Sequence, residues 1–207
     1  MIRKMIILGI LIAITTVIIT SGGRVLADTT DSTVYGSGNF GGCDYGSCSI
    51  TLTSGGPTSI NVVPTPTGKC TVQSDTASVL TDSTVGYSLT MTTSTTNNSM
   101  TGGSGSISAS GGTSAVPITL AMNTWGYRVD SLASFGAGPT SSQNSGSIPS
   151  VTFAGVPPSN LAGTVVANSS GPANPAVNTT VWYGVCADSS IPAGSYTTTV
   201  TYTAVTN

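Results

Sequence analysis

The sequence predicts an all-β protein built as a single antiparallel β-sandwich of roughly nine to eleven strands. Two observations predict it. Thr, Val and Tyr fill the patterned runs, whereas 26 Gly and 11 Pro leave little uninterrupted sequence for helices. Apolar residues also recur with a period of two, and clusters of Gly, Pro, Ser and Asp separate the runs, as expected for short strands joined by turns.

The N-terminal segment has the features of a signal peptide. Arg3 and Lys4 precede an almost wholly apolar run over 6–20, and Val25 and Ala27 occupy the small-residue positions before a cleavage site. We therefore predict a signal peptide over 1–27 and a β-sandwich domain over 28–207. The alternative is an uncleaved membrane helix, because the apolar run approaches the length that spans a bilayer. Both interpretations predict export. A cleaved signal peptide would contact the membrane only through residues 1–27, before cleavage.

The strands expected along the domain are short. A Gly/Ser-rich stretch near 95–114 separates two groups of them, and we interpret it as a long loop rather than an interdomain linker. The runs with strand patterning before the last thirty residues cover 49–53, 59–63, 70–75, 78–82, 86–92, 115–119, 125–129 and 150–154.

The last thirty residues carry the clearest strand, turn, strand pattern. One strand is expected over 181–187 and another over 196–203, with Pro192, Ala193 and Gly194 supplying the turn. In the final run Tyr and Val alternate with Thr, which indicates one buried and one solvated face. The sequence therefore predicts a closing β-hairpin.

Four cysteines in an exported chain indicate two disulfides, for which three pairings exist. Cys43 and Cys48 are close enough to pair locally, which leaves Cys70 with Cys186. Zinc binding is disfavoured because the chain has no His and lacks paired C-x-x-C spacings. We expect no metal site and no cofactor.

The charged residues exclude several functions. After residue 27, Lys69 and Arg128 are the only basic residues against seven aspartates, so no basic patch for nucleic acid exists. With no His and no Glu, the chain lacks the usual general acids and bases, and we predict that it is not an enzyme. The aspartates do not show the dense spacing of a dedicated Ca²⁺ loop.

Aromatic residues are the candidate ligand-binding residues. Trp182 lies on the strand face opposite Tyr183, so it points away from the expected core. Either it packs beneath a loop, or it forms with Trp125 and Tyr127 an exposed platform that stacks on glycan rings or contacts a protein. The Thr row over 197–203 is interpreted as a solvated sheet face.

Several motifs carry a resemblance to a known group of domains. C-T-V-Q-S-D, G-Y-S-L-T-M, T-W-G-Y-R-V, V-W-Y-G-V-C-A-D and P-A-G-S-Y-T-T-T-V-T-Y resemble the Ig-like sandwich domains of bacterial secreted surface proteins. The closing motif is similar to the end of spore-coat U and fimbrial-type domains, and the G-Y-S-L run is similar to WxL-type domains. Neither Trp125 nor Trp182 is followed by the Leu of a W-x-L motif. The resemblance implies an Ig-like or fimbrial-like, extracytoplasmic, non-catalytic module.

The sequence thus predicts a secreted bacterial cell-surface protein with a structural or adhesive role. One alternative is a carbohydrate-binding module that uses exposed aromatics. Another is a pilin-like subunit that assembles by donating a strand to its neighbour. The expected partners are glycans, cell-wall polymers or other surface proteins, recognised through short-range contacts because so few charges are present.

Overall fold

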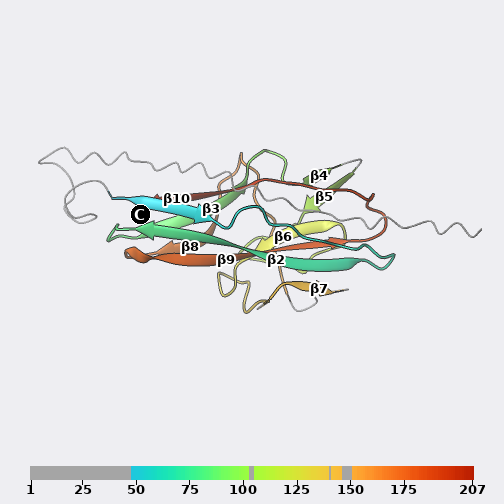
Figure 1. The fold of residues 1–207 in the computed structure, drawn as a ribbon, viewed down its shortest axis with the longest axis horizontal. Coiled ribbons are helices and arrows are strands. Elements are labelled where there is room, and N and C mark those ends of the chain that lie inside the picture. The colour runs from blue at the N-terminus through green and yellow to red at the C-terminus, as the bar shows by residue number, and fades with distance from the viewer. Residues whose placement is uncertain (1–47, 103–104, 140, 146–150) are drawn as a thin grey trace, which may run out of the picture.

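The computed structural model describes residues 48–102, 105–139, 141–145 and 151–207. Within these ranges the chain forms strands and no helix, which confirms the all-β prediction (Figure 1). No helix long and apolar enough to cross a membrane occurs in this part of the chain. The predicted signal peptide over 1–27 and Cys43 lie outside the described residues.

The strands are β1 (Ile50–Ser54), β2 (Lys69–Thr81), β3 (Tyr87–Thr93), β4 (Met100–Gly102), β5 (Gly105–Ala109), β6 (Thr124–Arg128), β7 (Gln143–Ser145), β8 (Thr164–Ser169), β9 (Ala173–Ala187) and β10 (Val200–Thr206).

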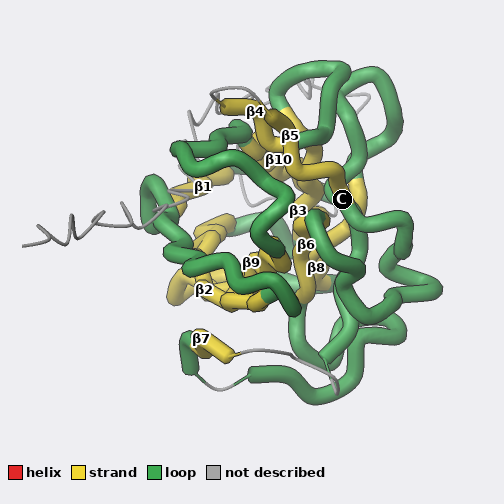
Figure 2. The backbone as a smooth tube through the Cα atoms, turned by 90° about the vertical axis from the view of Figure 1, so that its right-hand side faces the viewer, coloured by secondary structure: helices red, strands yellow, loops and turns green. Residues whose placement is uncertain are grey.

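The strands form two sheets. The large sheet has the order β1-β2-β9-β6-β5-β4, with β7 added beside β2, and the small sheet has the order β10-β3-β8. All pairs are antiparallel except β5 with β6, which is parallel and departs from the purely antiparallel prediction. Figure 2 shows long loops on several sides of the strands.

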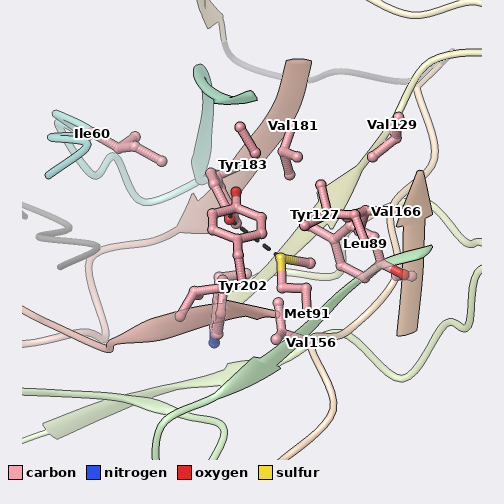
Figure 3. Packing of buried hydrophobic residues seen from close by; sticks show 14 of the residues in the cluster. Ile60, Leu89, Met91, Tyr127, Val129, Val156, Val166, Val181, Tyr183 and Tyr202 are labelled. Atoms are coloured by element: carbon pink, nitrogen blue, oxygen red, sulfur yellow. Dashed lines mark hydrogen bonds between the residues drawn. The ribbon is translucent and has the colours of Figure 1, made fainter. Parts of the chain in front are cut away.

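A single cluster of buried side chains joins the two sheets. The inner face of β2 and β9 contributes Val79, Val181 and Tyr183, which pack toward Leu89 and Met91 of β3 and Tyr202 of β10 (Figure 3). The period of two in these strands therefore reflects one face turned to a shared core. Each fully buried side chain of this size contributes about 1.5–3 kcal/mol to folding.

A second, smaller cluster covers the opposite face of β2 and β9. Its members are Cys70, Val72, Leu120, Val151, Phe153, Trp182 and Cys186. The ring of Phe153 lies so close to Gly184 that a Cβ at this position would meet ring carbons at 2.6 and 2.7 Å. Glycine at this position therefore lets the loops pack directly on the outer face of the sheet at the end of β2 and β9 that carries Cys70 and Cys186.

The predicted closing hairpin is wrong. β9 belongs to the large sheet, whereas β10 pairs with β3 in the small sheet, from Val200↔Thr93 to Thr206↔Tyr87. The intervening residues cross between the sheets: Tyr196 is buried, its hydroxyl donates to Pro192 O at 2.8 Å, and Thr197 pairs with Thr101. The alternation predicted the buried face of β10 correctly, but it carries no information about which strand lies alongside.

The predicted loop near 95–114 also contains strands. β4 and β5 lie in it and pair through Met100↔Ile107, whose side chains are both fully buried. Met100 and Ile107 are the only large apolar residues in this polar stretch, which is too few to reveal a period. Loops and short strands therefore share this stretch.

The predicted disulfide between Cys70 and Cys186 is present, with an S–S distance of 2.03 Å. These residues are directly paired on neighbouring strands, so the bond fastens one end of the β2–β9 ladder. Cys43, the predicted partner of Cys48, lies outside the described residues.

Removing this disulfide should destabilise the domain. The bond joins residues 116 positions apart, and loss of a long-range disulfide typically costs about 2–5 kcal/mol. We expect the variant Cys70→Ala/Cys186→Ala to show this loss in the free energy of unfolding, measured by denaturant titration. A matched control is Ser78→Ala/Asn178→Ala, a directly opposed pair on the same strands, for which the change should stay near 0.5 kcal/mol. Equal losses in both variants would contradict the role assigned to the disulfide.

Candidate functional site

The three aromatic residues expected to form a ligand platform are buried. Trp125 and Tyr127 on β6 have no exposed surface, and Trp182 on β9 is 7 % exposed. The indole of Trp125 donates to Asn98 O at 2.9 Å, and the Tyr127 hydroxyl lies 2.7 Å from that of Thr164. These rings therefore do not form an exposed platform, which was one of the two interpretations of the sequence.

The physical reason differs between the two strands. β6 lies between β9 and β5, and its aromatic side chains pack into the core shared by the sheets. Trp182 does point away from that core, as predicted from its alternation with Tyr183. Loop residues Leu120 and Phe153 cover it, so it makes the packing contact beneath a loop that was the alternative interpretation.

A polar network lies buried between the two sheets (Figure 3). The hydroxyls of Tyr183 and Tyr202 are hydrogen-bonded at 2.7 Å, and that of Tyr183 also lies 3.3 Å from Met91 Sδ. Tyr202 donates to Asp75 Oδ2 at 3.5 Å, while Asp75 Oδ1 accepts from the backbone amides of Thr76 and Gly55. The network therefore links β2, β9, β10 and β3.

Burial sets the protonation equilibria in this network. Desolvation raises the pKa of Asp75, although hydrogen bonds from Thr76, Gly55 and Tyr202 act in the opposite direction. Burial also raises the pKa of Tyr202 and, more strongly, that of Tyr183. Both phenols are therefore neutral at physiological pH and act as hydrogen-bonding groups.

A polar pocket of about 400 Å³ lies next to Asp75, lined by 55–59 and 73–76. Gly55 is packed against the carboxylate, because a Cβ there would meet Asp75 Oδ1 at 2.6 Å. Within the described ranges no group of three or more His, Cys, Asp or Glu is placed to hold a metal ion. The Asp75 carboxylate accepts hydrogen bonds from two backbone amides and from the Tyr202 hydroxyl.

An open groove lies between β8 and the first half of β9. Its volume is about 470 Å³. Buried Tyr87, Val129 and Val166 form an apolar floor, and exposed Asn178 and Thr180 of β9 lie at its rim. β6 pairs with β9 only from Trp182 onward, so in the described part of the chain the preceding half of β9 has a partner strand on one side only.

Val177 shows that this groove is an uncovered part of the core. It pairs directly with Val79, so the two side chains share the inner face of the large sheet. Val79 is fully buried, whereas Val177 is 44 % exposed. The small sheet ends at β8 and does not extend over Val177.

One wall of the groove is the loop after β6, and buried Arg128 fixes it. Its guanidinium donates to Asp130 Oδ1 at 2.9 Å, to Thr152 O at 3.1 Å, and to Phe135 O and Gly136 O at 3.0 Å. Ser131 and Ala133 in this loop have φ angles of 61° and 49°, a left-handed conformation that is unusual for residues other than glycine. Such backbone persists where surrounding contacts enforce it, so the groove wall is preformed.

Sequence reasoning did not identify the groove. The available signal was Pro175 within β9, because a proline inside a strand marks an edge or an irregular pairing. Pro175 lies in the half of β9 that has a described partner strand on one side only, and it lies where the β2–β9 register shifts, between Val79 and Thr81.

No family model, curated protein or solved structure matches this chain.

The buried carboxylate makes a test by pH possible. Because the folded-state pKa of Asp75 is raised, its contribution to stability is fully present below its unfolded pKa and is lost as pH rises through the folded value. An Asn at this position keeps an acceptor for Gly55 and Thr76 and adds a donor toward Tyr202. We therefore expect Asp75→Asn to be at least as stable as the wild type at pH 7 and to lose that relative advantage on acidification, measured by urea titration from pH 7 to pH 3.

Asp188→Asn is the control of opposite sign. Hydrogen bonds from the Ser190 hydroxyl and amide and from Asn123 lower the pKa of Asp188, so its stabilisation is lost as pH falls. The stability deficit of Asp188→Asn should therefore shrink on acidification. A pH-independent difference between Asp75→Asn and the wild type would contradict the assignment for Asp75.

Proposed function

We propose that this chain is an exported, non-catalytic structural or adhesive module of a bacterial cell surface, with a β-sandwich of Ig-like or fimbrial-like type. Two sheets that share one core support the sandwich. The disulfide between Cys70 and Cys186 fits an oxidising location. Among the described buried side-chain polar atoms, Ser83 Oγ is the one without a hydrogen-bond partner. The other buried polar groups form hydrogen bonds within the protein, which is consistent with a structural role.

The outer face of the small sheet is the feature that best supports an adhesive role. Thr92↔Thr201 and Thr90↔Thr203 are cross-strand pairs on β3 and β10, and all four side chains are partly exposed. We call these four residues the threonine face. It presents hydroxyls and methyls without charge on a regular sheet surface, whereas loops cover the outer face of the large sheet around Trp182.

Such a face suits short-range recognition of uncharged surfaces. Threonine hydroxyls can hydrogen-bond to polymer hydroxyls and amides, and their methyl groups can contact apolar patches. Long-range electrostatic steering would be weak. The carbohydrate-binding alternative would now rest on these hydroxyls, because Trp125, Tyr127 and Trp182 are buried.

Assembly by strand donation between copies is a second candidate, favoured by the outer edge of β8, with which no described strand pairs. The argument that a closing hairpin makes the fold self-contained no longer applies, because β9 and β10 lie in different sheets. Size-exclusion chromatography of the mature protein tests this candidate, since strand donation produces concentration-dependent oligomers.

The adhesive proposal is tested by binding to isolated bacterial cell walls and to an immobilised glycan panel. We expect binding that changes little with salt and that weakens at least tenfold, about 1.4 kcal/mol, in Thr201→Glu/Thr203→Glu. These substitutions place charges on the threonine face and leave the core intact.

The matched control is Thr51→Glu/Thr53→Glu, which changes two exposed threonines at the same spacing on β1. It adds the same charge but should keep binding, with folding of both variants checked by thermal melts. Equal binding by the two variants, or binding that collapses with salt, would remove the support for the threonine face.

A further inference from the structure

The edge of β2 that faces away from β9 has a gap between its two partner strands. On this edge β1 pairs with residues 77–81 and β7 pairs with residues 70–72. No described strand pairs with this edge along residues 73–76. The polar pocket beside Asp75 occupies this gap, and residues 55–59, where the chain leaves β1, form its other wall.

Hydrogen-bond acceptors lie together at the gap. The backbone of Thr76 faces it, because the Thr76 carbonyl accepts from the Gly55 amide at 2.9 Å and the Thr76 amide donates to Asp75 Oδ1 at 2.7 Å. In an antiparallel ladder the backbone groups of alternate residues point to the same edge, so the carbonyl of Ser74 is directed to the gap as well. The gap therefore brings a carboxylate and a backbone carbonyl together.

The Asp75 carboxylate is a buried acidic group whose partners are neutral. The residue is 6 % exposed, and its partners are the amides of Thr76 and Gly55 and the hydroxyl of Tyr202. Burial raises the pKa of this carboxyl, and what opposes the rise is these hydrogen bonds rather than a cation. A buried carboxylate without an opposite charge is costly, so a cation in the pocket would stabilise it.

The chain itself does not supply that cation. After residue 27 its basic residues are Lys69 and Arg128. Lys69 is six residues from Asp75 on the same strand, which is about 20 Å. Arg128 is in register with Trp182 of β9, on the face of the sheet opposite Asp75, and it pairs with Asp130. A compensating charge must therefore come from a ligand.

We propose that this pocket binds the primary ammonium group of an amino sugar, with the Asp75 carboxylate as its anchor. A compact ammonium suits the site better than a guanidinium, because Asp75 Oδ1 already accepts from two amides and the carboxylate cannot offer both oxygens to a planar fork. The three N–H donors of an ammonium group can be shared between this carboxylate and the Ser74 carbonyl.

The walls of the pocket favour a sugar as the carrier of the amine. Thr58, Ser59 and Gln73 line it, and its volume is about 400 Å³. Their hydroxyl and amide groups can bond to the hydroxyls of a sugar ring, whereas the apolar stem of a lysine side chain would gain little from them.

Glucosamine titrated into the isotope-labelled protein at pH 6.5, where its amine is protonated, tests the site by NMR. We expect saturable shifts of the amide signals of Gly55 and Thr76, which donate to Asp75 Oδ1, with a dissociation constant in the millimolar range of a small ligand. N-acetylglucosamine is the matched control, because it keeps the ring but has no positive charge, and it should cause no such shifts.

Two variants locate the anchor. Asp75→Asn should weaken glucosamine binding at least tenfold, because it removes the charge while keeping an acceptor for both amides. Asp188→Asn removes a carboxylate that does not line the pocket and should leave binding unchanged. Thermal melts give a second measurement: glucosamine should raise the melting temperature of the wild type and not that of Asp75→Asn.

Three results would overturn the proposal. Shifts that do not saturate, or that tetramethylammonium chloride reproduces without any N–H donor, would show charge screening only. Equal binding by Asp75→Asn and the wild type would remove the carboxylate as the anchor. Tighter binding of N-acetyl-lysine than of glucosamine would assign the pocket to a peptide side chain.

This inference is independent of the adhesive role of the threonine face. The pocket lies at an edge of the large sheet, whereas the threonine face belongs to the small sheet. Wall binding is read from Thr201 and Thr203 and glucosamine binding from Asp75, so either proposal can fail without the other.

Discussion

The antiparallel ladder between β2 and β9 is the interaction on which the rest of the structure depends. It runs from Lys69↔Ala187 to Thr81↔Ala173, and the other strands of the large sheet join through it: β1 and β7 beside β2, and β6 beside β9. Its inner face carries the core shared with the small sheet, and its outer face carries the cluster beneath the loops. Both hydrophobic clusters therefore rely on one register, which the Cys70–Cys186 disulfide fastens at one end.

Buried polar groups fix how the remaining parts sit on this ladder. The contacts of Asp75, Tyr183 and Tyr202 link the two sheets, and Arg128 links the loop after β6 to Thr152. Burying a carboxylate or a guanidinium carries a desolvation penalty that hydrogen bonds only partly offset, so such groups are weak sources of stability. These groups instead fix the relative positions of the strands and loops, because their hydrogen bonds can form in only one arrangement of those elements.

The sequence revealed local periodicity well and tertiary partners poorly. The buried face of β10 and the outward direction of Trp182 follow from the alternation of side chains along a strand. The partner of β10 does not, because nothing in 188–199 states whether the chain turns back or crosses to the other sheet. The burial of Trp182 depends on Leu120 and Phe153, which are distant in sequence. The Cys70–Cys186 pair was predictable because four cysteines leave few pairings, whereas the exposure of Val177 depends on where another strand ends.

The two sheets differ in what they leave uncovered, and this difference locates the candidate functions. Loops cover the outer face of the large sheet around Trp182 and Cys186, while the outer face of the small sheet carries partly exposed threonines and no described strand pairs with the outer edge of β8. Threonine suits the bare face, because its β-branched side chain favours strands while its hydroxyl keeps the surface hydrated. A free edge without charge or proline is different, since it would pair with other chains if nothing covered it. The small sheet therefore has two surfaces of different kinds: a partly exposed threonine face, and an edge at β8 that no described strand pairs with.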